Sequence, residues 1–239
     1  MLQIGNLSVH YRGLYALQNL SFSVEPGQLV GVIGPNGAGK STLIKAMLGL
    51  IPCSDGTVHF NGFPIAQQLL KVAYVPQRTQ VDWDYPTTVW NVVMTARTRQ
   101  TGLFRKPDSH SLQLVCHALE RVGIWNLRDR QIGKLSGGQQ QRVFMARALA
   151  QAADLLLFDE PFTGVDRQTE EIFYLIFKEL RDQGKSLLVI HHNLEAGMQH
   201  YDKLVLLNKT LIAIGNPTSV LSDRNVVAAY GHRLVLLSA

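Results

Sequence analysis

The motif Gly34-Pro35-Asn36-Gly37-Ala38-Gly39-Lys40-Ser41 matches the pattern G-x-x-x-x-G-K-[ST]. It lies between a predicted buried strand, Gln28–Ile33, and a predicted helix, Lys40–Leu50. Glycines allow backbone N–H groups to close around phosphate oxygens, and the helix N-terminus adds positive potential. We therefore expect a phosphate-binding loop, with Lys40 on the β- and γ-phosphates. Ser41 is expected on Mg²⁺, with Thr42 as a nearby donor.

Two carboxylates follow the apolar run Leu155–Phe158, which is typical of a buried strand. In an open α/β sheet, ligands bind outside the carboxyl ends of the strands. Asp159 is predicted to hold Mg²⁺, and Glu160 to polarise the attacking water as a general base. Two acids in this position are also typical of a plain strand-end turn. Their pairing with the phosphate loop favours the catalytic interpretation.

The 239 residues, 46% of them hydrophobic, fit a single domain over 1–239. Strands and helices alternate in the predicted pattern, which indicates an α/β core with a largely parallel sheet. Helices predicted at Thr88–Arg99, Ser109–Val122 and Gly138–Ala150 form a helical subdomain at about 83–150. The tail at about 222–239 carries no clear pattern. The other predicted elements are strands within 2–33, at Thr57–Phe60, Val72–Val75, Leu155–Asp159, Leu187–His191 and Lys203–Leu207, and a helix at Gln168–Arg181.

Composition excludes several classes of protein. No apolar run approaches the ~20 residues that cross a bilayer, and the N-terminal residues do not resemble a signal peptide, so we expect a cytoplasmic protein. Cys53 and Cys116 are far apart and form neither a disulfide framework nor a zinc motif. The net charge of +5 suits a phosphate-rich ligand or an anionic membrane surface. Without a Lys/Arg run or an aromatic-interleaved basic patch, no nucleic-acid partner is expected.

A second glycine-rich turn, Leu135-Ser136-Gly137-Gly138-Gln139, opens a second predicted helix. One nucleotide cannot easily use two phosphate cradles. This segment resembles the signature motif of the ABC ATPases, and the other motifs occur in that family's order over about residues 2–220. The alternative for Ser136 is a simple helix N-cap.

This resemblance implies a P-loop NTPase core of the ABC type, with a mostly parallel sheet, an antiparallel β subdomain and a helical subdomain. It implies ATP and Mg²⁺ as cofactors. It also implies a head-to-tail homodimer in which Ser136, Gly137, Gly138 and Gln139 grip the γ-phosphate held by the other copy's loop. The backbone N–H groups of such a helix N-terminus are suited to an anion.

Three further positions match the family pattern. By resemblance, Tyr11 stacks on adenine, although a tyrosine there, taken alone, is more often an ordinary strand residue. Gln77 matches the glutamine that meets Mg²⁺ or water and senses the transporter partner; the alternative is an exposed loop amide. Asp166 matches the dimer-interface loop, and the alternative is a helix N-cap before Gln168.

His192 resembles the family's switch histidine, which contacts the γ-phosphate, and it follows a predicted strand. Its neighbour His191 leaves a second register open, because Asn193 departs from the usual His-Asp-Leu sequence. A metal site at the tandem histidines is not supported, since no other ligand lies at a suitable spacing.

An ABC ATPase without a membrane span acts on another molecule. Two classes are considered: a subunit of a membrane transporter, and a soluble enzyme of DNA repair or translation. The soluble enzymes resemble proteins with a long coiled coil between the phosphate loop and the signature, or with two ATPase domains in one chain. Transport is favoured, because no sustained heptads of a coiled coil lie between Lys40 and Ser136. Val81–Trp90 resembles the corresponding stretch of manganese, zinc and iron importers of the metal-chelate group. Trp83, Tyr85 and Trp90 are predicted to line a groove for a permease helix, with ordinary packing as the alternative for each.

The resemblance therefore implies an ATPase subunit at the cytoplasmic face of the membrane that energises metal import, with manganese first and zinc or iron next. Its partners would be an integral membrane permease and, indirectly, a solute-binding protein. An ABC ATPase for another substrate class, or a soluble one outside transport, is the alternative.

Overall fold

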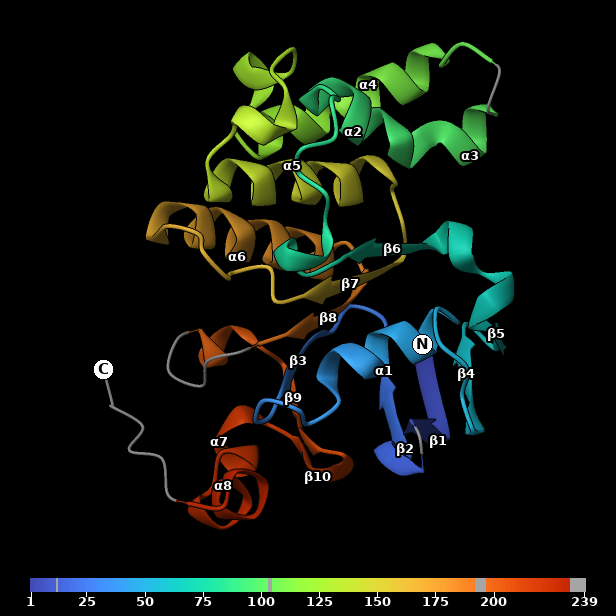
Figure 1. The fold of residues 1–239 in the computed structure, drawn as a ribbon, viewed down its shortest axis with the longest axis vertical. Helices are drawn as coiled ribbons and strands as arrows, with labels where there is room; N and C mark the ends of the chain where they lie inside the picture. The colour runs from blue at the N-terminus through green and yellow to red at the C-terminus, as the bar shows by residue number, and fades with distance from the viewer. Residues whose placement is uncertain (12, 103–104, 192–196, 233–239) are drawn as a thin grey trace.

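The computed structural model describes residues 1–11, 13–102, 105–191 and 197–232. Its central sheet has six strands in the order β10-β9-β3-β8-β7-β6 (Figure 1). Neighbouring strands are parallel except for β10, which is antiparallel to β9. The strands are β3 Leu29–Ile33, β6 Val72–Val75, β7 Leu155–Asp159, β8 Ser186–Ile190, β9 Lys203–Asn208 and β10 Thr210–Gly215.

Both faces of this sheet are buried. Along β7, Leu155 and Leu157 pack into one hydrophobic cluster, whereas Leu156 and Phe158 pack into another on the opposite face. This two-residue alternation follows from the pleat of a strand, and burial on both faces explains why the parallel strands read as continuous apolar runs. The carboxyl ends of β3, β6, β7 and β8 consequently share one edge, where the motifs were expected.

A second, antiparallel sheet has the strand order β2-β1-β4-β5. Its strands are β1 Leu2–Tyr11, β2 Leu14–Val24, β4 Asp55–Phe60 and β5 Phe63–Pro64. Helix α1, Lys40–Met47, lies between the two sheets, and its Leu43 and Ile44 join the cluster that both sheets line (Figure 1). The expected α/β core with an antiparallel β part is confirmed.

Helices cover the other face of the central sheet (Figure 1). Helix α6, Arg167–Asp182, lies beside β7 and β8, and α5 packs against α2 and α4 beyond it. These outer helices are α2 Val89–Met94, α3 Thr98–Thr101, α4 Ser109–Arg121 and α5 Gly137–Ala150. The helix predicted at Thr88–Arg99 is broken by a 3-10 turn, Thr95–Arg97, whose last residue is buried and donates to Ser111 Oγ and the Ala150 carbonyl oxygen.

The region after β9 contains three elements that the sequence pattern does not predict: β10, α7 at Pro217–Val220, and α8 at Asp223–Tyr230. Helices α7 and α8 pack on β9 and β10 at the edge of the central sheet (Figure 1). In the part of the chain that the structure describes, no helix has the length and apolar character needed to cross a membrane. Single 3-10 turns lie at Ile65–Gln67, Leu69–Lys71, Arg78–Gln80, Thr95–Arg97, Trp125–Leu127, Ile132–Lys134 and Met198–His200.

Candidate functional site

The predicted phosphate loop connects β3 to α1 and presses against neighbouring backbone. Gly34 has a φ of 153°, and a Cβ atom there would lie 2.0 Å from the Leu207 carbonyl oxygen. Gly39 has a φ of 95°, and a Cβ there would lie 2.6 Å from the Ala16 carbonyl oxygen. Both positions combine a left-handed conformation with no room for a side chain, so only glycine allows the loop to take this path.

Lys40 reaches back over the loop from the first turn of α1. Its Nζ donates to the carbonyl oxygens of Gly34, at 2.7 Å, and Pro35, at 3.1 Å. The residue is only 6% exposed. Burial lowers the pKa of this ammonium, while the charges of Glu160 and Asp159 oppose that shift. Among the described residues no carboxylate pairs with Lys40, and a buried cation held by two carbonyl oxygens is suited to exchange them for phosphate oxygens.

One pocket joins this loop to the end of β7. It is lined by Asn36, Gly37, Ala38, Gly39, Lys40, Ser41, Thr42 and Glu160. The fold thus brings a carboxylate from a distant part of the chain to the mouth of the loop, as the parallel-sheet argument predicts.

Asp159 and Ser41, both predicted to hold Mg²⁺, are in direct contact. Ser41 Oγ donates to Asp159 Oδ1 at 3.0 Å, whereas the buried Oδ2 makes no hydrogen bond in the described structure. Burial raises the pKa of Asp159 to about 6, against the lowering effect of the Ser41 hydrogen bond. A hydroxyl beside a buried carboxylate oxygen without a partner fits the oxygen ligands that Mg²⁺ prefers. The residues present therefore fit the predicted ion.

Glu160 and Gln77 are in direct contact. Gln77 Nε2 donates to Glu160 Oε2 at 2.9 Å, because Gln77 follows β6, the immediate neighbour of β7. Thr163 Oγ1 donates to the same carboxylate oxygen at 3.4 Å. Thr163 was not among the predicted site residues, although its position three residues after Glu160 could have suggested it. In this structure the Gln77 amide nitrogen thus meets the candidate base.

The second glycine-rich turn begins α5 with a complete capping box. Ser136 Oγ accepts from the Gln139 backbone N–H at 3.3 Å, and the Gln139 side chain accepts from the Ser136 N–H at 3.0 Å. The N-cap alternative for Ser136 is thus confirmed. Of the described residues that line the phosphate-loop pocket, none belongs to 136–139. A role for this turn on the γ-phosphate stays a prediction that requires a second copy.

Arg78 links the two parts of the site, and the sequence analysis missed it. Its Nε donates to Gln140 Oε1 at 3.0 Å, and its guanidinium lies 3.3 Å from the position of a Cβ on Gly137. The signal was its place directly after Gln77. The segment that meets Glu160 is therefore tied, one residue later, to the first turn of α5.

Asp166 lies at the start of α6, and Tyr11 lies at the end of β1. Asp166 caps α6, its Oδ1 accepting from the Thr169 N–H at 2.7 Å, and this bond lowers the pKa of the carboxyl. The N-cap alternative is again confirmed, and the dimer-interface role stays a prediction. Tyr11, at the end of β1, is 47% exposed, which leaves its ring accessible for stacking.

The structure describes one of the two candidate switch histidines. His192 lies outside the described residues. His191 is buried, its Nε2 lies 3.3 Å from the Tyr174 hydroxyl, and its ring packs 4.9 Å from that of Phe162. His192 is kept as the predicted switch, and the choice between the two histidines stays a prediction.

The predicted aromatic groove is only partly formed by the expected residues. The Trp83 ring packs 5.2 Å from Phe144, and Trp90 packs 6.3 Å from Trp125, so the packing alternative describes both tryptophans. Tyr85, in contrast, is 65% exposed. It lines a largely apolar pocket with Asp82, Thr87, Val92, Thr95, Ile132, Phe144 and Arg147.

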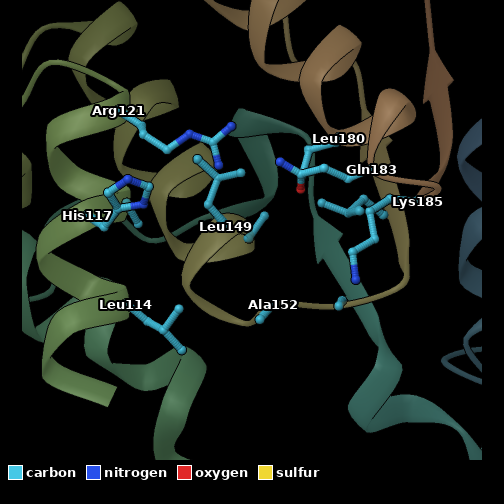
Figure 2. A pocket seen from close by; sticks show the side chains of 12 residues that line it. Leu114, His117, Arg121, Leu149, Ala152, Leu180, Gln183 and Lys185 are labelled. Atoms are coloured by element: carbon cyan, nitrogen blue, oxygen red, sulfur yellow. The ribbon is translucent and has the colours of Figure 1, made fainter. Parts of the chain in front are cut away.

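Another pocket lies between α4, α5 and the end of α6 (Figure 2). Arg121 pairs with Glu179, and Lys185 Nζ lies 2.6 Å from Asp154 Oδ1. Because both cations already have carboxylate partners, this pocket is poorly suited to phosphate. Its lining comprises Leu114, His117, Ala118, Arg121, Ala148, Leu149, Ala152, Ala153, Leu156, Leu180, Gln183 and Lys185.

Comparison with known proteins adds independent findings. Residues 17–163 match the model of the ABC transporter family. The chain is 43% identical over 235 residues to the manganese transport system ATP-binding protein MntB of Bacillus subtilis, covering 98% of this chain and 94% of that protein. It is 44% identical over 232 residues to the zinc transport system ATP-binding protein TroB of Treponema pallidum, covering 97% and 87% of the two chains.

Among solved structures, the chain resembles a protein assigned to the metal-chelate type of ABC transporter, in an inward-facing conformation. The TM-score is 0.83 at 27% identity, and the match covers 96% of this chain and 88% of the other.

Proposed function

Since this chain belongs to the ABC transporter family, we propose that it is the ATP-binding and ATP-hydrolysing subunit of an importer of a divalent metal ion. Manganese is the first choice for the ion, with zinc or iron next. The observation that carries the ATPase activity is the single pocket in which the loop 36–42 meets Glu160. The choice of metal rests on the relatives named above.

The loop and Lys40 bind the phosphates of ATP. Lys40 exchanges the carbonyl oxygens of Gly34 and Pro35 for oxygens of the β- and γ-phosphates, where its charge offsets that of the nucleotide. Backbone N–H groups of 36–42 and the N-terminus of α1 complete the cradle. Tyr11 stacks on the adenine ring.

Glu160 accepts the proton of the attacking water as that water approaches the γ-phosphorus. Gln77 and Thr163 orient its carboxylate by donating to Oε2. His192 is the residue that we assign to the γ-phosphate as the switch histidine. Ser41, Asp159 and Gln77 are the residues that would hold Mg²⁺, which supplies positive charge to the phosphates when bound.

A second copy of this chain completes the site in a head-to-tail homodimer. The turn Ser136–Gln139 of one copy grips the γ-phosphate that the other copy's loop holds, and Asp166 lies at the interface. This assignment is supported by the place of that turn outside the loop's own pocket, and by its cap, which leaves N–H groups of the first turn of α5 for an anion.

The membrane permease docks at the apolar pocket around Tyr85, Phe144 and Arg147. A short amphipathic helix of the permease would place its apolar face there. Movement of this helix would reach Glu160 through Gln77, and α5 through Arg78 and Gln140. The subunit is thus peripheral, at the cytoplasmic face of the membrane, and a solute-binding protein delivers the ion on the other side.

Metal accumulation in cells tests the proposal. Cells that lack the endogenous gene receive either the unaltered chain or Lys40→Ala, and uptake of manganese, zinc and iron is measured in parallel. Loss of uptake of one ion in the Lys40→Ala cells identifies the cargo. Unchanged uptake of all three ions would overturn the metal assignment, while ATP turnover of the purified chain tests the ATPase assignment separately.

A further inference from the structure

The turn between β9 and β10 contacts the backbone of the phosphate loop. The Lys209 backbone N–H donates to the Ala38 carbonyl oxygen at 2.8 Å, and the Leu207 carbonyl lies directly against Gly34. The turn is also bonded to β2, since the Gln18 N–H donates to the Lys209 carbonyl at 2.7 Å. Lys209 adopts a φ of 58°, an unfavourable conformation that such surrounding contacts must maintain.

The same turn is anchored to helix α8. Asn208 Nδ2 donates to the Ala229 carbonyl oxygen, in the last turn of α8, at 3.0 Å. This carbonyl is one of the helix-terminal groups that the helix itself leaves without a partner. Ala229 and Val226 are buried where α8 packs on β9 and β10, so the anchor point is itself fixed in the hydrophobic core.

Tyr230, the last residue of α8, brings a second group to the loop. Its hydroxyl is buried and makes no hydrogen bond in the described part of the chain. Burial raises the pKa of Tyr230 to about 12 and the backbone of Gly34 lowers it in opposition, so the hydroxyl lies near the start of the phosphate loop.

We propose that α8 and the β9–β10 turn form a brace that positions the phosphate loop, with Asn208 and Tyr230 as its positioning residues. The proposal rests on the proposed function, since the loop must bind nucleotide. The brace restrains Gly34, the first residue of the loop, and Ala38, the residue before its last glycine, so the loop's N–H groups stay directed at phosphate before nucleotide arrives. Pre-organisation of this kind lowers the ordering cost of binding.

Asn208→Ala is the test, with Asn225→Ala as its matched control. Asn225 also donates its side-chain amide to backbone carbonyls, those of Ser219 and Val220 at 3.2 Å, and it lies on α8. Each variant removes a partly buried amide near α8, yet only Asn208 belongs to the turn that contacts the loop. Calorimetric titration of the full-length chain with ADP and ATP measures affinity, and urea unfolding without nucleotide measures stability.

Asn208→Ala is expected to raise the Kd for both nucleotides about fivefold, the effect of one ordinary hydrogen bond. Asn225→Ala should lower the urea midpoint comparably but leave Kd unchanged. In steady-state assays, Asn208→Ala should raise KM for ATP more than it lowers kcat. Should Asn208→Ala fail to fold, Tyr230→Phe, which keeps the ring, decides instead: it should weaken ADP binding without lowering the urea midpoint.

Unchanged nucleotide affinity in Asn208→Ala, or equal weakening in both asparagine variants, would overturn the brace while leaving the proposed function intact. If the unaltered chain bound no nucleotide, the proposed function itself would fail, and the brace with it. The two failures are therefore separate results of one experiment.

Discussion

Glu160 has a backbone φ of 54°, a left-handed conformation that a residue with a side chain rarely adopts. Such a conformation costs on the order of 1–3 kcal/mol and persists only where surrounding contacts maintain it. Here Gln77 and Thr163 both donate to the carboxylate, and the buried strand β7 holds the preceding residue. The strain therefore places the carboxylate at the phosphate-loop pocket instead of letting it turn into solvent.

Glu160→Gln should keep ATP binding but lower turnover by roughly 10² to 10⁴, the usual contribution of a general base. The amide keeps the shape of the side chain and loses only its basicity. Glu171→Gln is the matched control, since Glu171 pairs with Arg167 on the exposed surface of α6. The rate of phosphate release and the nucleotide affinity are measured for both variants. Near-normal turnover in Glu160→Gln would rule out the role of base.

Asp159 predicts a distinctive pH dependence of stability in the absence of Mg²⁺. Burial raises its pKa from 3.8 to about 6, so folding favours the protonated carboxyl. Its contribution is present below pH 4 and is lost as pH rises through about 6. Asp159→Asn, which cannot ionise, should therefore gain stability relative to the unaltered chain, on the order of 3 kcal/mol, between pH 4 and pH 8.

Urea unfolding at a series of pH values, with a chelator present, measures this difference. Added Mg²⁺ should stabilise the unaltered chain at pH 8 and have little effect on Asp159→Asn, because the ion needs the carboxylate. A stability difference between the two proteins that stays constant with pH would show that folding does not raise the pKa of Asp159.

At the scale of elements, α4 and α5 begin in the same way but are expected to do different work. Asp108 caps α4 by accepting from the Ser111 N–H at 2.7 Å, and Ser136 caps α5 through its capping box. A cap satisfies one of the N–H groups that a helix start leaves open. The N-terminus of α4 matches no nucleotide-binding motif, whereas that of α5 carries the glycine-rich turn.

Ser136→Ala should lower the free energy of unfolding by about 1 kcal/mol, and Asp108→Ala should also lower the urea midpoint. Only Ser136→Ala should reduce ATP turnover, because the hydroxyl lies in the turn proposed to grip the γ-phosphate of the other copy. Comparing urea midpoints with ATPase rates separates the two effects. Equal losses of turnover in both variants would mean that the Ser136 hydroxyl acts through folding alone.

At the scale of the whole molecule, the proposed sharing of the site between two copies predicts complementation between two inactive variants. Ser136→Arg places bulk and charge in the turn but leaves the loop intact, whereas Glu160→Gln leaves the turn intact. In a head-to-tail dimer of one copy of each, one of the two sites combines an intact loop with an intact turn. An equimolar mixture should therefore recover up to about a quarter of the normal turnover, as random pairing requires.

The control is each variant alone at the same total concentration, which should stay inactive. Ser136→Arg should still bind ATP in its own loop, measured on the monomer. If the mixture is no more active than its components, or if Ser136→Arg blocks binding to its own chain, the site is not shared between copies.

The sequence pattern was sufficient wherever the determinants are local. The spacing of the glycines with Lys40 and Ser41 predicts the loop between a strand and a helix, because only glycine tolerates its backbone path. The apolar run before Asp159 predicts a buried strand, and the parallel arrangement then predicts which edge carries the acids. The residue types in these motifs also indicate the chemistry.

The local pattern was insufficient where an element is defined by what packs on it. Helix α8 is short, and isolated helices of that length are marginal in water, so it depends on burial against β9 and β10. The two tryptophans Trp83 and Trp90 could not be assigned from their sequence positions, because packing partners Phe144 and Trp125 are distant in the chain.

The sequence by itself determined the phosphate loop, the acids that face it, the α/β core and the family, since each depends on residue types at short spacing. Only the tertiary structure decided that Gln77 meets Glu160, that Arg78 joins this contact to α5, and that Asn208 ties the loop's support to α8. These are contacts between side chains far apart in sequence, and their geometry exists only once the sheet has set the strand order β9-β3-β8-β7-β6.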